Sequence, residues 1–271
     1  MSSLLKTEWL KIKKYPAFWW MTALVALSYP GINYIFYRAF KEITERGDAR
    51  AVMVMKMLLG NPFTFPEVWH TVAYASSMFV FIPSIVVIMF ITNEYTYKTH
   101  RQNIIDGWSR GQFMASKLID VLIIALLTTA VFITVALLIG YININEYHGD
   151  VWGETKYIGL FFLQTFSQLS IAFLIALLTR RAFIALGIFI FYKIAEKIFV
   201  AIATFRLNDT GRFLPFEVSN RLIPVPAFLG HFDEKGYQKS LDMISQHIVF
   251  TFILLLLTWG FCFWLNKKRD L

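Results

Sequence analysis

Apolar residues in this chain gather in six stretches of about 20 residues, separated by more polar segments of varied length. A helix needs about 20 predominantly apolar residues to cross the hydrocarbon core of a bilayer. The pattern therefore predicts an all-α membrane protein with six transmembrane helices. Pro30 and Pro83 lie inside the first two stretches, where each removes a backbone hydrogen bond and should bend its helix. The expected spans are 17–37, 70–92, 118–141, 157–179, 182–203 and 245–265.

The composition agrees with a membrane protein. Of the 271 residues, 57% are hydrophobic, whereas soluble domains are usually about 45–50% apolar. Six spans and their connections occupy the whole of residues 1–271, so we expect a single transmembrane domain and no separate soluble domain. Cys262 is the one cysteine, which excludes an internal disulfide framework.

Lysine and arginine set the expected orientation, because cytoplasmic loops are richer in them. If the N-terminus is cytoplasmic, the inside segments hold 13 Lys and Arg in 49 residues, and the outside segments hold 11 in 88. We therefore expect both termini in the cytoplasm. The formal net charge of +8 is then a topology signal, and nucleic acid is not an expected partner, since no basic patch lies on a soluble domain.

Two segments outside the spans have patterns of their own. Residues 1–15 carry apolar side chains at helical spacing among four lysines, which predicts an amphipathic helix in the cytoplasmic interface. A plain basic flank is the alternative. The extracytoplasmic segment 204–244 contains three prolines and an apolar patch at 222–229 that a soluble loop does not need. We expect it to re-enter the membrane or to pack against the outer surface.

Polar side chains inside the spans are candidates for a substrate pathway. Lys193 lies roughly 18 Å into the fifth span at 1.5 Å per residue, and Glu196 shares its helix face, where an ion pair would lower the cost of burial. Ionisable groups in a membrane are costly and indicate function. Alternatively, the span ends near Tyr192 and both groups lie at the outer interface. Gln164 and Gln168, one turn apart on span four, either hold helices together or contact substrate.

Common motifs for nucleotide binding, metal binding and dithiol redox chemistry are absent from the sequence. It contains no GxxxxGK(S/T) loop, no HExxH and no CxxC. The five histidines are scattered, so we expect no metal site. Five residues separate His100 from Asp106, whereas four separate the histidine–aspartate pair of membrane acyltransferases. This spacing weakens the hypothesis of an enzyme without excluding it.

The connection between spans two and three, residues 93–117, is longer and more patterned than a simple connector needs. The pattern predicts a short amphipathic helix at the cytoplasmic surface, with its polar face toward a soluble partner. The interleaved apolar residues are Ile104, Ile105, Trp108 and Phe113.

At these residues the chain resembles the permease subunits of ABC-2-type ABC transporters. The shared pattern is an acidic residue leaving span two, a Thr-Arg step, a Ser-Arg pair and a lysine entering span three. Here these are Glu94, Thr99 with Arg101, Ser109 with Arg110, and Lys117. A subgroup of these permeases also shares the residue types of Gln102, Asn103, Asp106 and Gly107, and of Phe65-Pro66 with Trp69. Lys98 departs from the pattern, because many relatives have glycine there.

The resemblance implies a fold, partners and a mechanism. Two permease chains pair in the bacterial inner membrane, and two separate ATPase subunits bind below them with ATP and Mg. The loop after span two is the coupling helix, most members are exporters, and this chain itself carries no cofactor and is not an enzyme. The residues expected to couple to the ATPase are Glu94, Thr99, Arg101, Gln102, Ile105, Asp106, Gly107, Trp108, Ser109, Arg110 and Lys117. Those expected to line a substrate pathway are Lys193, Glu196, Gln164 and Gln168.

Two other classes of protein stay open at this stage. A polytopic membrane enzyme, an acyltransferase or a hydrolase, would need a catalytic set, and the candidates are Lys193, Glu196 and His247. A channel or secondary transporter often has an internal repeat, and we find none. The ABC exporter permease is the preferred hypothesis.

Overall fold

The computed structural model describes residues 16–45, 61–105, 107–144, 150–206, 209–230 and 232–268. Within these ranges every regular element is a helix and there is no strand. The all-α prediction is confirmed for this part of the chain. The expected interfacial helix, residues 1–15, lies outside the described residues.

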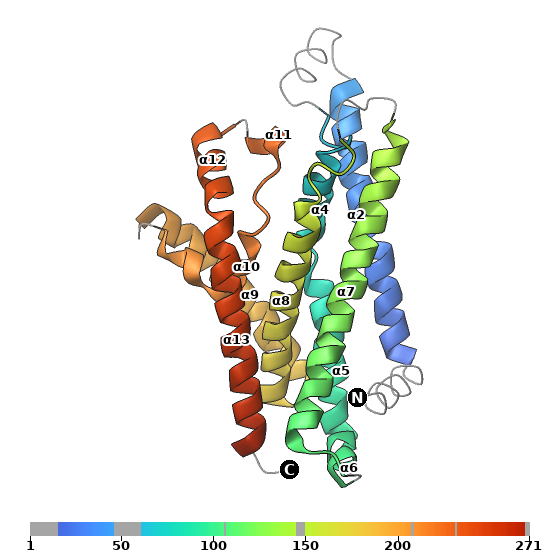
Figure 1. The fold of residues 1–271 in the computed structure, drawn as a ribbon, viewed down its shortest axis with the longest axis vertical. Coiled ribbons are helices and arrows are strands. Elements are labelled where there is room, and N and C mark those ends of the chain that lie inside the picture. The colour runs from blue at the N-terminus through green and yellow to red at the C-terminus, as the bar shows by residue number, and fades with distance from the viewer. Residues whose placement is uncertain are drawn as a thin grey trace.

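Six long segments alternate in direction along the molecule (Figure 1). They are α2 (Pro16–Glu45), the pair α4 (Val68–Ser77) and α5 (Phe81–Thr96), α7 (Arg110–Ile142), α8 (Lys156–Thr179), α9 (Ala182–Arg206) and α13 (Ile244–Lys268). The shorter helices are α6 (Thr99–Ile105), η2 (Thr210–Phe213), α10 (Pro215–Asn220), α11 (Ala227–Gly230) and α12 (Glu234–Asp242). In Figure 1, α6 lies at one end of the molecule, and α11 and α12 lie at the other.

Among the described residues, α7, α8 and α13 are each long and apolar enough to cross a membrane. The pair α4 and α5 counts as a fourth span if its two parts, which meet at 48°, are taken together. The helices α2 and α9 cover the other two predicted ranges, but among the described residues neither is apolar enough to count as a span. The helix α9 contains the charged residues Lys193, Glu196 and Lys197, and α2 contains Asn33. Helical structure is thus confirmed at all six ranges, and sufficient length and apolarity at three or four.

The bend between α4 and α5 has a cause in the sequence. Pro83 lies in the first turn of α5 and has no N–H, so it cannot continue the hydrogen-bond ladder across the turn at 78–80. Ile82 N donates instead to Phe79 O at 3.0 Å. The bend predicted from Pro83 is confirmed, whereas α2 continues as a helix through Pro30.

Two helices are longer than their apolar runs. The helix α2 continues to Glu45, eight residues past the predicted limit, through charged residues that favour helix formation. The helix α7 begins at Arg110 instead of 118, because Ser109 caps it. The connection predicted at 93–117 therefore contains the end of α5, the whole of α6 and the first two turns of α7.

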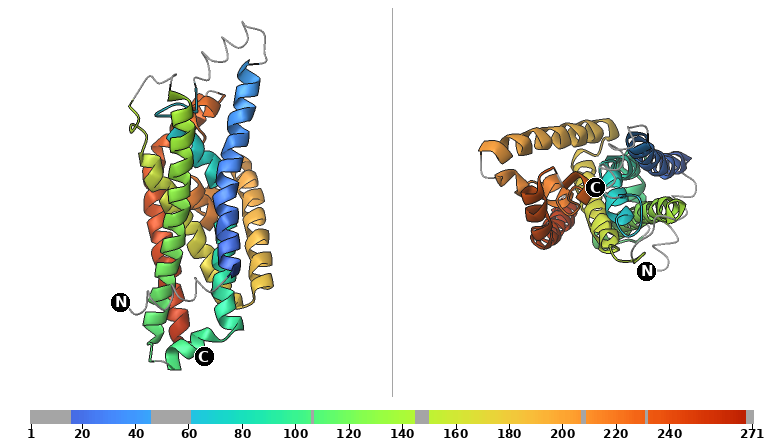
Figure 2. Two further views of the ribbon diagram at one scale, coloured as in Figure 1. Left: turned by 90° about the vertical axis from the view of Figure 1, so that its right-hand side faces the viewer. Right: turned by 90° about the horizontal axis from the view of Figure 1, so that it is seen from above.

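The core of the molecule lies around α8, which packs against α4, α5, α7, α9, α10 and α13. Aromatic side chains fill the contacts, with Phe161 against Phe132 at 4.6 Å between ring centroids and Phe173 against Trp259 at 4.8 Å. The helix α9 leans away from the others, and its far end lies at the edge of the molecule (Figure 2). Large apolar side chains stay exposed along α7, α9 and α13, as on surfaces that face lipid.

Candidate functional site

A buried triad of charged residues joins α5 to α7 near the α6 end of the molecule. Lys117 Nζ lies 2.7 Å from Glu94 Oε1 and 3.0 Å from Asp120 Oδ2. The three side chains are 1%, 6% and 3% exposed, respectively. The ammonium group also lies 5.1 Å from the ring centroid of Phe90 and 5.5 Å from that of Phe113. A cation with two carboxylates and two ring faces around it holds the two helices in one register.

Hydrogen bonds to the backbone carbonyl of Glu94 hold the turn from α5 into α6. This carbonyl oxygen accepts hydrogen bonds from His100 Nδ1 at 3.1 Å and from Thr99 Oγ1 at 3.4 Å. His100 is buried, its ring packs on Tyr95, and burial lowers the pKa of its imidazole below the usual value. Since a carbonyl can only accept, Nδ1 carries the hydrogen in this arrangement.

Lys98 stands in this turn with a φ of 56°. This is the left-handed region, where glycine is least strained. The lysine, which stands where the permeases that this loop resembles often have glycine, therefore leaves the turn in a glycine-like conformation. The cost is backbone strain at a charged residue.

The turn from α6 into α7 has its own hydrogen bonds. Trp108 N donates to Asn103 O at 3.0 Å across Gly107, which has a φ of 97°. Ser109 and Gln112 form a capping box, with Gln112 N donating to Ser109 Oγ at 3.2 Å and Ser109 N to Gln112 Oε1 at 2.9 Å. Arg110 then connects α7 to the end of α13 by donating from Nη1 to Lys267 O at 2.8 Å.

These contacts divide the predicted coupling residues into two groups. Glu94 and Lys117 are enclosed in the triad, Thr99 supports the α5–α6 turn, and Gly107, Ser109 and Arg110 shape the start of α7. The exposed group consists of Arg101, Gln102 and Ile105 on one face of α6, with Trp108 partly buried beside it. Asp106 lies outside the described residues. Asp120, which completes the triad, was not among the predicted site residues, because the sequence shows charges but not which charges meet.

A second group of polar side chains, here called the amide cluster, lies inside the bundle and comprises Gln164, Gln168, Lys193 and Asn220. Both glutamines donate from Nε2 to Asn220 Oδ1, at 3.2 Å and 2.8 Å. Lys193 Nζ donates to Gln168 Oε1 at 3.3 Å and lies 5.7 Å from the ring centroids of two phenylalanines. Within the described residues no carboxylate lies at ion-pair distance from Lys193. Asn220, at the centre, was not predicted, because its loop gave no periodic signal.

Glu196 has a different partner from the one expected. Its Oε1 accepts a hydrogen bond of 2.6 Å from the backbone N–H of Glu217, in the first turn of α10, and its side chain is buried. Among the described residues it forms no ion pair with Lys193. His247 is also buried and packs on Phe250, and no hydrogen bond joins it to Lys193 or Glu196 in that part of the chain.

The segment after α9 turns back into the molecule. The helix α10 packs against α8, α9 and α13, and Phe216 inserts its buried ring between Phe189, at 5.5 Å, and Tyr192, at 5.7 Å. Figure 1 shows α10 part of the way down α13, below α11 and α12. Residues 204–244 thus contain a segment, α10, that packs among the long helices; re-entry of residues 204–244 into a membrane stays a prediction.

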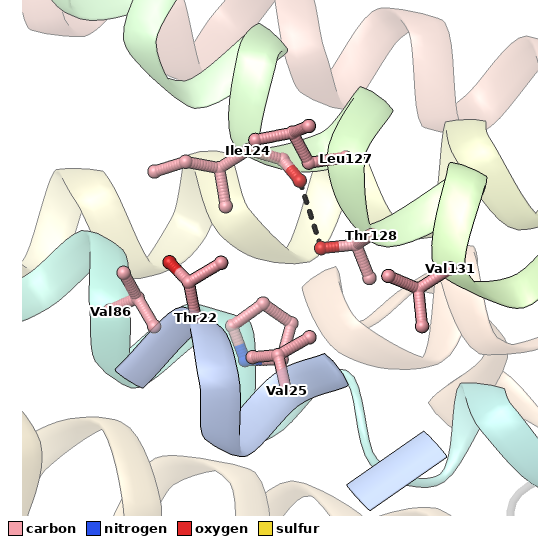
Figure 3. A pocket seen from close by; sticks show the side chains of 8 residues that line it. Thr22, Val25, Val86, Ile124, Leu127, Thr128 and Val131 are labelled. Atoms are coloured by element: carbon pink, nitrogen blue, oxygen red, sulfur yellow. Dashed lines mark hydrogen bonds between the residues drawn. The ribbon is translucent and has the colours of Figure 1, made fainter. Parts of the chain in front are cut away.

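A small hollow between α2, α5 and α7 is the other enclosed feature (Figure 3). Its volume is about 30 Å³, about one water molecule. Its lining is apolar apart from Thr22 and Thr128, and Thr128 Oγ1 donates to Ile124 O at 2.8 Å. The hollow is a packing gap beside Pro83 and too small for a substrate.

The fold and these sites define a class of protein. The described part of the chain is helical, and several of its helices are apolar enough for a multi-pass membrane protein. No three histidine, cysteine, aspartate or glutamate side chains in that part are grouped to hold a metal ion. Residues 53–271 match the model of a family described as a protein of unknown function, DUF2705, and the chain belongs to this family. No curated protein matches the sequence.

Proposed function

We propose that this chain is the permease subunit of an ABC exporter and that α6 couples it to a separate ATPase subunit. The observation that carries the proposal is the exposed face of α6, formed by Arg101, Gln102 and Ile105 at the end of the molecule. Directly behind this face, the buried triad fixes the two helices that α6 connects. The resemblance to ABC-2 permeases falls on the same residues and gives the helix its role.

The proposed topology has six spans: α2, α4 with α5, α7, α8, α9 and α13. Their directions alternate, so the α6 end of every span lies on one side of the membrane (Figure 1). In the sequence, the segments at that end carry Lys and Arg at about twice the density of those at the other end, which supports a cytoplasmic location for that end and for both termini. The segment around α10 then re-enters from the outer side, where it is covered by protein rather than lipid. The bacterial inner membrane follows from the resemblance.

The mechanism is mechanical coupling. ATP and Mg act on the partner ATPase, and this chain pairs with a second permease chain. When the ATPase dimer closes, the force on α6 passes to α5 and α7 together, because Lys117 binds a carboxylate on each. Glu94, Lys117 and Asp120 are positioning residues in this scheme, and Ile105 with Arg101 supplies the contact. Apolar anchors beside charges are the usual composition of an interface centre.

The amide cluster is the proposed polar part of the substrate pathway. Lys193 is a cation inside the bundle without a carboxylate beside it among the described residues. Ionisable groups placed in this way commonly mark substrate or ion pathways. Gln164 and Gln168 keep it in contact with α10 through Asn220.

Co-purification in mild detergent from the native host tests the coupling surface. Ile105 is 77% exposed, so Ile105→Glu should leave the fold intact and reduce the recovered ATPase subunit by about tenfold or more, since a charge would enter the contact. Phe232→Glu is the matched control: this residue is 82% exposed at the opposite end of the molecule. A wild-type chain that purifies without any nucleotide-binding partner, or equal ATPase recovery in both variants, would contradict the proposal.

A further inference from the structure

An open cleft of about 460 Å³ lies beside α6, between the α5–α6 turn and the turn that joins α8 to α9. The cleft shares Arg101 with the coupling face, but neither that face nor the resemblance gives a role to Arg180 and Arg181 on its other side. Its lining residues are Tyr95, Thr96, Lys98, His100, Arg101, Thr179, Arg180 and Arg181. Half of them are lysine or arginine, and none is a carboxylate.

Positive charge converges on this cleft from two separate parts of the chain. Lys98 and Arg101 come from one side, and Arg180 and Arg181 come from the other. The pKa of the buried His100 imidazole reflects this positive charge. Burial lowers that pKa most, and the nearby guanidinium groups of Arg180 and Arg101 lower it further. Four cations around one hollow repel one another, and a bound anion removes that repulsion.

One of the cations, Arg180, is also held in place. It has a φ of 56° and its guanidinium lies 4.9 Å from the ring centroid of Tyr95. Its Nε is buried and has no hydrogen-bond partner among the described residues. Lys98, on the opposite side, has the same left-handed φ. Strained backbone conformations and unsatisfied buried donors are both common at ligand sites. Here Lys98 and Arg180 have such a backbone conformation, and Arg180 also has such a donor.

The backbone adds to the same effect. The helix α9 has 25 residues and starts at Ala182, directly after Arg181. The first N–H groups of a helix have no acceptor within the helix, and that end carries a partial positive charge. With the four side chains, this arrangement suits the oxygens of a phosphate group.

The surroundings of the cleft identify the source of the phosphate. Phe183, two residues after Arg181, is 90% exposed, and the apolar side chains of Ile184 and Leu178 beside it are also exposed. A phosphate in the cleft therefore has exposed apolar surface next to it, along the start of α9. Basic pockets between helices on the cytoplasmic side are suited to anionic headgroups. We propose that this cleft binds the phosphate of an anionic phospholipid of the inner leaflet, with its acyl chains along α9.

This inference rests on the topology proposed above, but its test needs no ATPase. The full chain is placed in nanodiscs of phosphatidylcholine alone or with phosphatidylglycerol, and thermal unfolding and bound lipid by native mass spectrometry are measured. We expect phosphatidylglycerol to raise the unfolding temperature and to stay bound. Arg180→Gln with Arg181→Gln should weaken that binding by about tenfold or more, since each cation near the surface contributes to attraction for anionic lipid. Lys235→Gln with Lys239→Gln, two exposed cations at the other end, is the matched control and should change nothing.

Further arms distinguish the sources of the ligand. Arg180→Lys with Arg181→Lys keeps the charge and should retain most of the lipid binding. If inorganic phosphate produces the same stabilisation and phosphatidylglycerol adds nothing, the ligand is a soluble phosphate and the lipid proposal is wrong. Equal stabilisation of wild type and the glutamine variant would also overturn it. If the two arginines affect only recovery of the ATPase, the cleft is part of the protein contact and the lipid proposal is wrong. If the chain binds the lipid but purifies from its host without any nucleotide-binding partner, the permease proposal fails and the lipid proposal stands.

Discussion

Two lysines in this protein have opposite surroundings. Lys117, near α6, is buried, with a carboxylate on each side and two aromatic rings over it. Lys193, in the amide cluster, is partly buried, and among the described residues its contacts are the amide oxygen of Gln168 and two more distant rings. The cost of burying an ammonium group is offset in the first case and is largely uncompensated in the second. The same side chain therefore stabilises one region and strains the other.

This contrast distinguishes a lysine with a structural role, Lys117, from Lys193, the lysine proposed to line a pathway, although both are residues of the same type. The buried triad has the features of a fixed joint: it is enclosed, paired and located where α5, α6 and α7 meet. The amide cluster instead holds a lysine that has no carboxylate at ion-pair distance among the described residues, beside a segment that turns back into the bundle. Strain that a protein retains is commonly found where a ligand relieves it. Four substitutions test this comparison.

Lys117→Met should have the largest effect. It leaves Glu94 and Asp120 buried without their cation, and breaking a buried ion pair in this way costs about 3–5 kcal/mol. We expect a large fall in the unfolding temperature in detergent and poor recovery from the membrane. Thermal unfolding followed by tryptophan fluorescence measures the change.

Lys156→Met provides the control for Lys117→Met. Lys156 lies 2.9 Å from Glu154, a spacing similar to that in the triad, but its side chain is 57% exposed. Exposed ion pairs contribute at most about 1 kcal/mol, so this variant should behave like wild type. Adding Glu94→Gln and Asp120→Asn to Lys117→Met removes the orphaned charges and should restore part of the stability. If Lys117→Met unfolds no earlier than Lys156→Met, the triad does not hold the helices together.

Glu196→Ala should come next. It removes the acceptor of the Glu217 N–H, and an unsatisfied buried donor costs about 1–3 kcal/mol. The consequence is local, because the contact holds α10 inside the bundle. In a Cys262→Ala background, a cysteine at the buried Ser219 should react with a maleimide about tenfold faster in this variant. Glu196→Gln keeps a side-chain oxygen there and should react slowly; equal rates would show that Glu196 does not hold α10.

Lys193→Met should change stability in the opposite direction from Lys117→Met. It removes a partly buried charge that has no close carboxylate among the described residues, at the cost of one hydrogen bond to Gln168, so we expect a gain of about 1 kcal/mol in the free energy of unfolding. Lys193→Arg keeps the charge and should show no gain. Stability lost in Lys193→Met would mean that the ammonium group has a structural role, and the contrast between the two lysines would fail.

The sequence predicted the helices well, because long apolar runs signal helices that cross a membrane whatever they pack against. It predicted less of the sites. Glu94 and Lys117 were both singled out, but their direct contact depends on how α5 and α7 pack, and no local pattern encodes that. The partner of Glu196 was missed for the same reason: the nearest charge along the helix is Lys193, whereas the actual donor is the backbone of Glu217. Asn220 was missed because its role exists only once α10 has turned back toward α8.

Asp209→Asn should have the smallest effect, since it lies outside both regions. Arg221 makes a bidentate pair with this carboxylate, at 2.5 Å and 2.6 Å, and lowers its pKa below the usual 3.8. A folded pKa below the unfolded one means that the stabilisation is present above the unfolded pKa and is lost as the pH falls through the folded value. The pair is partly exposed, so we expect less than about 1 kcal/mol at pH 7. Asparagine also tolerates the left-handed φ of 61° at this position, which keeps the backbone matched. The difference in unfolding temperature between wild type and variant should therefore shrink below about pH 4. A difference that stays constant down to pH 3 would show that the carboxylate contributes through packing, and that charge pairing matters here only inside the bundle.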